Sequence, residues 1–492
     1  MTTIINAKIG ESKGLPRVWM EGQKLHHGGV QIGKKYAIKA DVTAKRLELI
    51  EVPFDFTGKH LTVSKRERNG VIHPVIDLRS GQIREVFEDD DKVRIALRRG
   101  RIVITALQIQ TKIRERLKRI KDKLDRGEKL PVASLFHGGG VLDRAIHSGM
   151  LRAGVGSFIQ VGVELESEYL DASLRNNPQL WTEDSIAISS DVRDVYLGDN
   201  TPEVCILVGG IPCVGASRSG KSKNKLKCAE DHDEAGALYI DYLNWVRALN
   251  PAIALIENVS DYANTASMSA IRKVLIHLGY ELHETVLNAW DFGALERRER
   301  MVLVAITKGL GETFSFDNLK VNNVRESCIS NILDPIPLDD DRWKRYEYLA
   351  EKEIRDKAAG KGFRRQLLTG KEDGCGVIGR HYFKGRSTEP FLIHPVRPEL
   401  SRLFTKGEHA RIKGIPQEIL NGVSETTAQE MAGQSVGYGQ FESVGEEIGG
   451  CLLPVRNNIL KFPKPQQALD KLEDDKHSAP LVVQIGTMSL FN

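Results

Sequence analysis

The chain has few of the features that mark membrane, secreted or metal-binding proteins. Its 492 residues include six cysteines, with no CxxC pair or other spacing typical of a metal site. No apolar run approaches the length that crosses a bilayer, and residues 1–6 lack a basic stretch followed by an apolar one. We therefore expect a reduced, cytoplasmic protein with no membrane partner and no bound metal.

An excess of charge of one sign is also missing. Lysine and arginine number 70 against 66 aspartates and glutamates, a net charge of +4. The chain is therefore not a polycation, and any contact with nucleic acid must come from local basic patches. The length suits two to four domains, and a hydrophobic content of 41% is enough to bury a substantial core.

Residues 1–105 predict a β-rich N-terminal domain. Two hairpins are expected, from Tyr36–Lys39 with Arg46–Ile50 and from Lys92–Leu97 with Arg101–Thr105. Each follows a glycine-containing turn, which indicates a degenerate internal repeat. The segment is similar to the swapped-hairpin barrels of small DNA-binding transcription factors, and a structural or partner-binding β-domain is the alternative.

A basic linker helix is predicted for residues 106–130. Apolar residues fall near helical spacing at Leu107, Ile109, Ile113, Leu117, Ile120 and Leu124. Basic residues crowd the other positions: Lys112, Arg114, Arg116, Lys118, Arg119, Lys121 and Lys123. Two interpretations stay open, a face that lies against DNA phosphates and a solvated linker. Gly127 ends the helix and marks a domain boundary.

Strands and helices alternate over residues 131–310, which predicts a doubly wound α/β domain with a mostly parallel sheet. Each predicted strand ends in residues suited to ligand binding. In order these are Phe136 with the glycine-rich turn to Gly140, Glu164, Asp191, the turn Gly210–Cys213, and Glu257. Because parallel strands end at one edge of the sheet, where such folds bind ligands, we expect these residues in one site.

The residue types indicate a nucleoside and a reacting substrate. Glu164 can accept from ribose hydroxyls and Asp191 from an adenine amino group. Pro212 fixes φ and so presents Cys213 in one direction, and the polar, basic loop that follows can close over an anionic substrate. Taken singly, each has a plainer interpretation: Cys213 or Phe136 as core, the acids as solvated strand ends, and Glu257 as a helix cap.

Residues from about 131 to 310 and from 398 to 450 resemble the DNA (cytosine-5) methyltransferases. The resemblance rests on ordered stretches: Ser134–Gly140, Gly210–Cys213, Glu257–Val259, Glu296–Arg300, Arg402–Pro416 and Ala432–Gly437. It implies a Rossmann-like methyltransferase domain at 131–310, a small target-recognition region at 311–397, a return to the catalytic domain at 398–455 and a C-terminal tail at 456–492.

The resemblance also implies a reaction, methylation of cytosine C5 in double-stranded DNA. Cys213 would add to C6 of a flipped-out base, and Glu257 would contact N3 and the exocyclic amine. Of Arg298 and Arg300, one would hydrogen-bond the cytosine O2 and the other would steady the loops of the active site.

S-adenosylmethionine is the methyl donor that the resemblance implies. Phe136 would stack on its adenine, Gly138 and Gly140 would admit its methionine end, and Glu164 and Asp191 would hold the ribose and the adenine amine. Further cofactor neighbours are Leu165, Pro212 and Gln434.

Double-stranded DNA is the implied partner. The residues expected to contact it are Ser217, Arg218 and Lys221 after the cysteine, and Arg364, Arg365, Arg380, Lys384 and Arg386 in the recognition region. We expect a monomer on DNA, at the nucleoid of a prokaryotic cytoplasm. Nothing in the chain is typical of a nuclease, so any restriction partner would be a separate protein. A merely solvated loop is the alternative for the recognition region.

Four positions differ from the family pattern: Val214 and Glu296 stand where glutamine is usual, Ala216 where an aromatic residue is usual, and Gln434 where asparagine is usual. They concern loop geometry and contacts with DNA. Two rival functions remain, an RNA cytosine-5 methyltransferase and a DNA-binding regulatory protein with weak catalysis. The Cys-Phe-Thr triplet typical of the first is not found, and the intact Cys213, Glu257 and Arg300 argue against the second.

Overall fold

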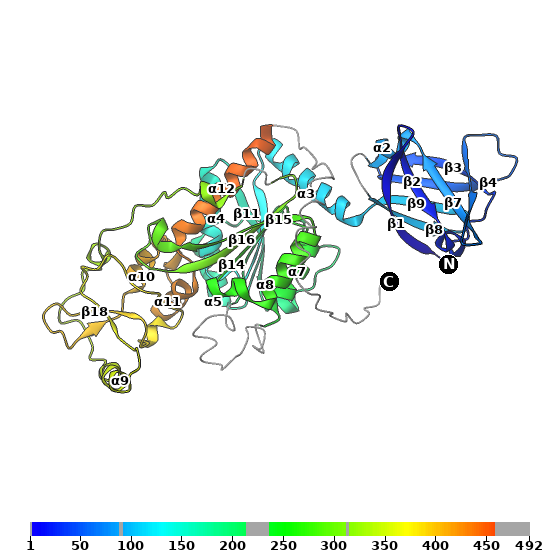
Figure 1. Ribbon diagram of the computed structural model, residues 1–492. Helices are drawn as coiled ribbons and strands as arrows, with labels where there is room; N and C mark the ends of the chain where they lie inside the picture. The colour runs from blue at the N-terminus through cyan, green and yellow to red at the C-terminus, as the bar shows by residue number, and fades with distance from the viewer. Residues whose placement is uncertain (1, 88–91, 213–235, 311–313, 458–492) are drawn as a thin grey trace. The chain divides into compact units, whose positions relative to one another are not determined.

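The computed structural model describes residues 2–87, 92–212, 236–310 and 314–457, with side chains described as far as residue 453. It divides into two compact units, with the boundary between Lys112 and Ile113 (Figure 1). Of the helices in these ranges, none combines the length and the apolar character that crossing a membrane requires.

The first unit is a nine-stranded antiparallel sheet with two short helices. Its elements are β1 Thr3–Ser12, β2 Leu15–Glu21, α1 Gln23–His27, β3 Lys35–Asp41, β4 Arg46–Val52, β5 His60–Thr62, β6 Ser64–Arg68, β7 Val71–Arg79, α2 Gly81–Phe87, β8 Lys92–Arg98 and β9 Arg101–Ala106. Both predicted hairpins are confirmed, as β3 with β4 and as β8 with β9. Alternate residues of these strands face a core that includes Leu47, Leu49, Ile95 and Ile102.

The predicted internal repeat is confirmed as two copies of one strand–helix–hairpin module, β2–α1–β3–β4 and β7–α2–β8–β9. The copies pair through β2 with β7 and through β4 with β9. The strand order is β5-β3-β4-β9-β8-β1-β2-β7-β6, and the two end strands are separated in the chain by Val63 alone. The sheet therefore closes on itself as a barrel. Its similarity to DNA-binding barrels stays a prediction.

The second unit is built on a seven-stranded sheet of order β12-β11-β10-β13-β14-β16-β15. Its strands are β10 Leu130–Leu135, β11 Ser157–Glu164, β12 Ile186–Ser189, β13 Ile206–Gly210, β14 Ile253–Asn258, β15 Tyr280–Asn288 and β16 Glu299–Thr307. The first five are parallel to one another; β16 runs antiparallel to β14, and β15 runs antiparallel to β16 and so in the direction of the first five, which confirms the mostly parallel sheet. All six side chains of β10 are buried, as expected for a strand covered on both faces.

The helices cover both faces of this sheet. From β10 the chain steps outward through α4 Val141–Arg152 to β11, and through α5 Ser167–Asn176 to β12. It then steps the other way, from β13 through α7 Leu238–Leu249 to β14 and on to α8 Ala266–His277. Right-handed crossovers in opposite directions put the two helix pairs on opposite faces, and α12 Tyr438–Asn457 packs on α4 (Figure 1).

The strand order reverses between β10 and β13, which are hydrogen-bonded neighbours. Chain segments that leave adjacent strands toward opposite faces open a crevice at the carboxyl ends of those strands. The turns that begin at Phe136 and at Ile211 both start there. The fold thus places the two most distinctive motifs of the sequence at one crevice.

Helix α3, Gln108–Asp125, has one basic residue that faces the protein interior. Arg116 is 2% exposed: its Nε donates to Asn250 Oδ1 at 2.6 Å and its Nη1 to the Leu278 carbonyl at 2.8 Å. Its guanidinium also lies 4.1 Å from the ring centroid of Tyr280. Arg116 falls on the apolar stripe of the helix, three residues after Ile113, so this basic residue anchors the helix to the second unit.

Arg116→Ala is expected to destabilise the second unit by about 3 kcal/mol, because it leaves the Leu278 carbonyl and the Asn250 side chain buried without their donor. Chemical unfolding followed by circular dichroism measures the change. Lys118→Ala, on the exposed side of the same helix, is the matched control and should stay within about 0.5 kcal/mol of wild type. Equal stability of the two variants would show that the anchor contributes nothing.

The recognition region has its own small sheet, of β17 Gln366–Leu368, β18 Pro390–Ile393 and β19 Ser401–Arg402, and a helix α9 Glu347–Ala358. Its apolar cluster also includes Leu295 and Ile412. Strand β19 and both of these residues lie outside the predicted bounds 311–397, so the compact region is larger than the sequence indicated. Helices α10 Lys406–Ile412 and α11 Glu425–Gln434 then lead back to α12.

Candidate active site

The predicted site residues of the described strands gather at one edge of the sheet. Leu135 pairs with Val163, Glu164 with Ser189, and Gly210 with Glu257, so the strand ends are in register. Cys213, Ser217, Arg218 and Lys221 lie outside the described residues. The half-buried Pro212 is the last described residue before them.

The turn that leads toward Cys213 is held against the end of β14. Asn258 Nδ2 donates to the Ile211 carbonyl at 3.0 Å. A Cβ atom at Gly210 would lie 3.4 Å from Glu257 Oε2, so the glycine lets the backbone pass close to that carboxylate. Asn258 was quoted in the motif without a role, and the structure shows that it fixes this turn.

Glu257 forms an ion pair with Arg300, whose Nε lies 2.7 Å from Glu257 Oε1. Both side chains are largely buried, at 14% and 11% exposed. Burial raises the pKa of Glu257, and the charges of Arg300 and Arg298 only partly oppose this. The carboxyl group is therefore tuned toward its protonated form, which can give a proton to a bound base.

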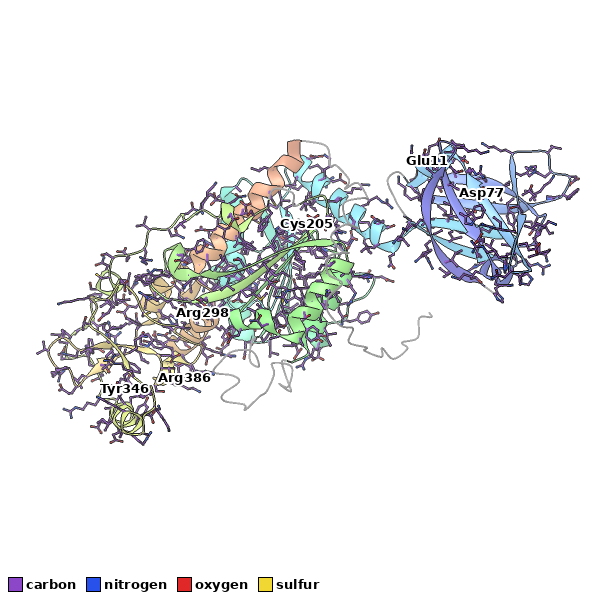
Figure 2. The ribbon with its side chains drawn as sticks, in the orientation of Figure 1. Glu11, Asp77, Cys205, Arg298, Tyr346 and Arg386 are labelled. Carbon is purple, nitrogen blue, oxygen red and sulfur yellow. The ribbon has the colours of Figure 1, made fainter. Side chains whose placement is uncertain are left out.

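The two arginines of the motif have different surroundings. Arg300 lies on Glu257, within the edge that carries the strand ends. Arg298 Nη2 donates to the Gly433 carbonyl at 3.0 Å, and its Nη1 lies 3.4 Å from the Ile378 carbonyl (labelled in Figure 2). Arg298 thus joins the recognition region to the end of α11.

A buried charge cluster beside Arg298 was not predicted. Lys413 Nζ lies 3.3 Å from Glu296 Oε2, and both residues are fully buried. Glu296 Oε1 accepts from the Ile378 backbone N–H at 2.6 Å, and Lys413 Nζ lies 3.4 Å from the Ile378 carbonyl. The pair therefore clamps Ile378 of the recognition region.

The pKa values of this pair reflect its burial. Burial lowers the pKa of Lys413 to about 7, and the neighbouring Arg298 acts in the same direction. For Glu296, burial alone would raise the pKa, but the charges of Lys413 and Arg298 outweigh it and hold the pKa below its usual value. No sequence pattern marks a lysine as buried, so its role could be found only from the fold.

The glycine-rich turn is shaped by Glu164. Glu164 Oε2 accepts from the Gly138 backbone N–H at 2.6 Å, and Oε1 accepts from the Glu166 N–H at 2.9 Å. Phe136 and Gly138 have positive φ values of 58° and 59°. The turn is therefore bent so that its backbone follows the carboxylate at the end of β11.

A network of buried polar side chains, which the sequence did not predict, also contacts the glycine-rich turn. Ser134 Oγ donates to Asp143 Oδ2 at 2.8 Å, and His137 Nε2 lies 2.7 Å from Ser173 Oγ. Gly140, at φ 76°, passes so close that a Cβ atom there would lie 2.6 Å from Ser173 Oγ. A side chain at this position would push the turn away from α5.

The other predicted cofactor residues, Gln434, Leu165 and Asp191, differ in their exposure and in their contacts. The exposed Gln434 has its Nε2 3.9 Å from the Cβ position of Gly138, so it borders the glycine-rich turn. Leu165 is 64% exposed beside Glu164. Asp191 accepts from Arg193 Nε at 2.9 Å and Nη2 at 2.6 Å, and this guanidinium lowers the pKa of Asp191.

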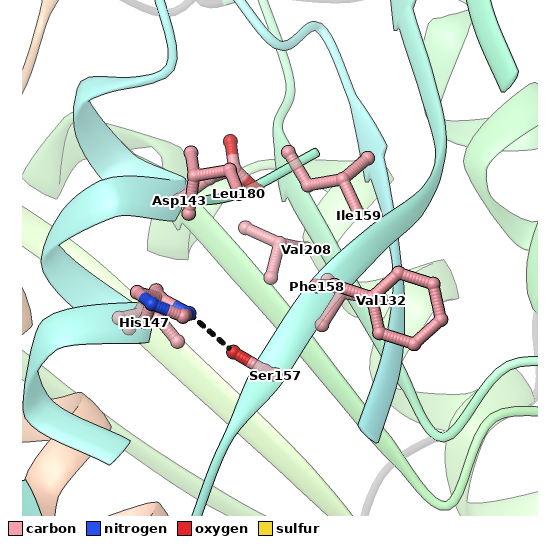
Figure 3. Close-up of a pocket in the computed structure, with 9 residues that line it drawn as sticks. Val132, Asp143, His147, Ser157, Phe158, Ile159, Leu180 and Val208 are labelled. Carbon is pink, nitrogen blue, oxygen red and sulfur yellow. Dashed lines mark hydrogen bonds between the residues drawn. The ribbon is translucent and has the colours of Figure 1, made fainter. Parts of the chain in front are cut away.

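A small interior cavity lies between β10, β11 and α4, away from the strand ends (Figure 3). His147 and Ser157 both line it, and His147 Nδ1 lies 3.0 Å from Ser157 Oγ. Its volume of about 10 Å³ has room for about one water molecule. This cavity is part of the packing and is not a substrate site.

The five basic residues predicted in the recognition region fall into two groups. Arg365 Nε pairs with Glu353 at 2.8 Å, and Arg380 Nη2 lies 3.0 Å from Glu166 Oε1 and 3.1 Å from the Tyr169 hydroxyl. These two guanidinium groups therefore bind other parts of the protein: Arg365 binds helix α9, and Arg380 binds the first turn of helix α5. Arg364, Lys384 and Arg386 are exposed (Arg386 is labelled in Figure 2).

Three buried thiols of the described ranges are unlike a nucleophile. Burial raises the pKa of Cys205 and of Cys451 to about 12, and it also raises the pKa of Cys375. Hydrogen bonds with Ser330 and Ser327 lower the pKa of the partly exposed Cys328. Within the same ranges no group of three or more histidine, cysteine, aspartate or glutamate side chains is placed to hold a metal ion.

A sequence model of the C-5 cytosine-specific DNA methylases matches residues 133–450. The match begins in β10 and ends in α12, so it includes every strand end described above and the recognition region. The chain belongs to this family. The N-terminal barrel lies outside the match.

Bacterial type II methyltransferases are among the relatives of the methylase. M.SsoII of Shigella sonnei is 27% identical over 258 residues, which are 50% of this chain and 64% of M.SsoII. M1.ScrFI of Lactococcus lactis subsp. cremoris is 26% identical over 258 residues, 50% of this chain and 62% of that protein. The chain thus spans less than two thirds of the length of these two relatives.

A solved structure shows the same fold. The S. pombe Dnmt2 methyltransferase superposes with a TM-score of 0.51 at 20% identity, over 66% of this chain and 99% of that one. The Rossmann-like methyltransferase fold expected for the methylase is therefore confirmed.

Proposed function

We propose that this methylase transfers a methyl group from S-adenosylmethionine to C5 of cytosine in double-stranded DNA. The observation that carries the proposal is the buried Glu257–Arg300 pair, set directly against the turn that leads to Cys213. An acid near the end of β14, paired with a cation at the start of the neighbouring strand β16, suits nucleophilic addition to a ring by a cysteine whose motif follows β13.

The chemistry requires all three groups. Cytosine C5 is a weak nucleophile, and a thiolate of Cys213 that adds to C6 makes C5 electron-rich. Glu257 gives its proton to N3 as the ring gains electrons, and Arg300 holds the cytosine O2. Because C6 is covered inside a stacked duplex, the base must be flipped into the site.

The glycine-rich turn fits S-adenosylmethionine. A Cβ atom at Gly138 would meet, within 4 Å, no described atom except Gln434 Nε2, so the backbone there is open to a ligand. Glu164 is buried at the strand end, where it orients the turn and would hold the ribose, and Phe136 is half-buried. S-adenosylmethionine supplies the electrophilic methyl group when it is bound.

The expected partner is duplex DNA, on which the methylase acts as a monomer in a prokaryotic cytoplasm, at the nucleoid. Any restriction endonuclease of the same system would be a separate protein. Arg364, Lys384 and Arg386 are the exposed cations of the recognition region that suit phosphate contacts.

The decisive experiment is methyl transfer from labelled S-adenosylmethionine to unmethylated plasmid DNA, with wild type beside Cys213→Ser. Wild type should yield labelled 5-methylcytosine and the variant none. A duplex that contains 5-fluorocytosine should trap wild type covalently and release the variant. Label on transfer RNA but not on DNA would replace the proposal with RNA methylation, and no label on either would refute it.

Glu164→Ala is expected to weaken S-adenosylmethionine binding about 10- to 100-fold, because the Gly138 N–H of the turn loses its charged acceptor and the ribose loses its acceptor. Calorimetric titration measures the affinity without any methyl transfer. Asp171→Ala, an exposed acid on α5, is the control and should bind as wild type does. Unchanged affinity in Glu164→Ala would remove this residue from the cofactor site.

A further inference from the structure

The N-terminal barrel carries a groove that the family match does not include. It has a volume of about 750 Å³ and lies between the loop before β3, the end of β4 and the β8–β9 turn. Its walls include the side chains Lys34, Lys35, Arg99, Glu51, Phe54 and Ile32. Three basic groups and one acid give the groove a positive lining.

The N-terminal barrel as a whole also carries a net positive charge. Residues 1–105 contain 20 lysines and arginines against 13 aspartates and glutamates, a net charge of +7. The other 387 residues sum to −3. The weak net charge of the chain therefore hides a strongly basic domain.

The aromatic ring of Phe54 is exposed to solvent in the groove, and basic side chains lie around it. Phe54 is 85% exposed, and Lys35 Nζ donates to its carbonyl at 2.6 Å while lying 5.1 Å from its ring centroid. Lys34 pairs with Glu51 at 2.7 Å. The exposed Arg99 follows on the adjoining turn, so two net positive charges border the ring.

We propose that this groove is a second DNA-binding site, which holds the backbone of duplex DNA independently of the catalytic unit. Lysine and arginine side chains bind phosphates, and an exposed phenylalanine between them contacts sugars or wedges against a base step. An acidic protein surface would satisfy the cations but gives the aromatic ring no comparable partner. The choice of DNA rests on the proposed function, which makes DNA the substrate.

The test is binding of the full-length chain to a duplex made of adenine and thymine alone, which offers no cytosine to flip. The variant Lys34→Ala with Arg99→Ala removes two cations of the groove. The matched control, Lys8→Ala with Lys92→Ala, removes two exposed cations that face each other across β1 and β8, at the end of β8 remote from Arg99. Circular dichroism checks that both variants are folded.

Loss of two phosphate contacts should lower the affinity roughly tenfold near 0.1 M salt and reduce the slope of log K against log salt by about 2. The control should keep the wild-type slope. Phe54→Ala should lower the affinity several-fold with the slope unchanged, because it removes a contact but no charge.

Equal losses in the groove variant and the control would overturn the proposal in favour of general charge, and no loss in either would refute it. Tighter binding of single-stranded polyuridine or of polyglutamate than of the duplex would assign the groove to RNA or to an acidic protein. The measurement needs no methyl transfer, so a failure of the proposed reaction leaves its outcome intact.

Discussion

Lys413→Gln should destabilise the catalytic unit by about 3–5 kcal/mol, the usual effect of breaking a buried ion pair from one side. The substitution leaves the fully buried Glu296 carboxylate without its ammonium partner, 3.3 Å away in the wild type. It also removes a contact to Ile378 of the recognition region. Denaturant unfolding measures the loss, and the exposed Lys371→Gln serves as the control.

The double variant Glu296→Gln with Lys413→Gln separates the pair from general disruption. Two amides of similar size can hydrogen-bond each other without a buried charge, so the double variant should be far more stable than the sum of the single effects predicts. Strict additivity of the two single effects would show that Glu296 and Lys413 do not act as a pair.

The same pair predicts a dependence of stability on pH. The pKa of Lys413 is about 7 in the folded protein, below its value of 10.5 in the unfolded chain. Between these values the unfolded chain binds more protons, so the unfolding free energy rises with pH from about 7 upward. The double variant should lack this rise, and unfolding titrations across that range would show it.

Glu257→Gln should lower the rate of methyl transfer by about 10²- to 10³-fold, the range found when a group that stabilises developing charge is removed. Glutamine keeps the shape of the side chain but cannot give up a proton to cytosine N3. It also leaves Arg300 without the carboxylate that lies 2.7 Å from its Nε. Single-turnover transfer from labelled S-adenosylmethionine measures the effect.

The control for this change is Glu299→Gln, an exposed acid beside Arg300. It should transfer methyl groups at the wild-type rate. Because burial raises the pKa of Glu257, its protonated form is present below that pKa and is lost as pH rises through it. Wild-type turnover should show this alkaline limb and Glu257→Gln should not, and a limb retained in the variant would assign the proton to another group.

The sequence was sufficient to predict the parallel strands and the residues at their ends. Each of these strands is a short apolar run followed directly by glycine or a polar residue, and parallel strands must end at one edge. Glu164 therefore lies on Gly138, and Glu257 lies beside Gly210.

The contacts that hold the site could not be predicted in the same way. Glu296 and Lys413 are far apart in the chain, and a buried lysine has the same local pattern as a solvated one. Arg380 was predicted to bind DNA because it lies in a basic stretch, whereas the structure places it on Glu166 and Tyr169. Arg116 was counted among the basic residues of α3 outside the apolar stripe, whereas the structure buries it on that stripe.

The two copies of the module in the N-terminal barrel place the groove and the exit of the chain at different ends of the domain. Strands β4 and β9 are equivalent and antiparallel, so the groove at the end of β4 and the exit of the chain at the end of β9 lie at opposite poles. The two copies differ in sequence just before their hairpins: Gly33-Lys34 precedes β3, whereas Asp90-Asp91 precedes β8. The chain that leaves β9 therefore does not pass the basic groove, which stays open at the other pole of the barrel.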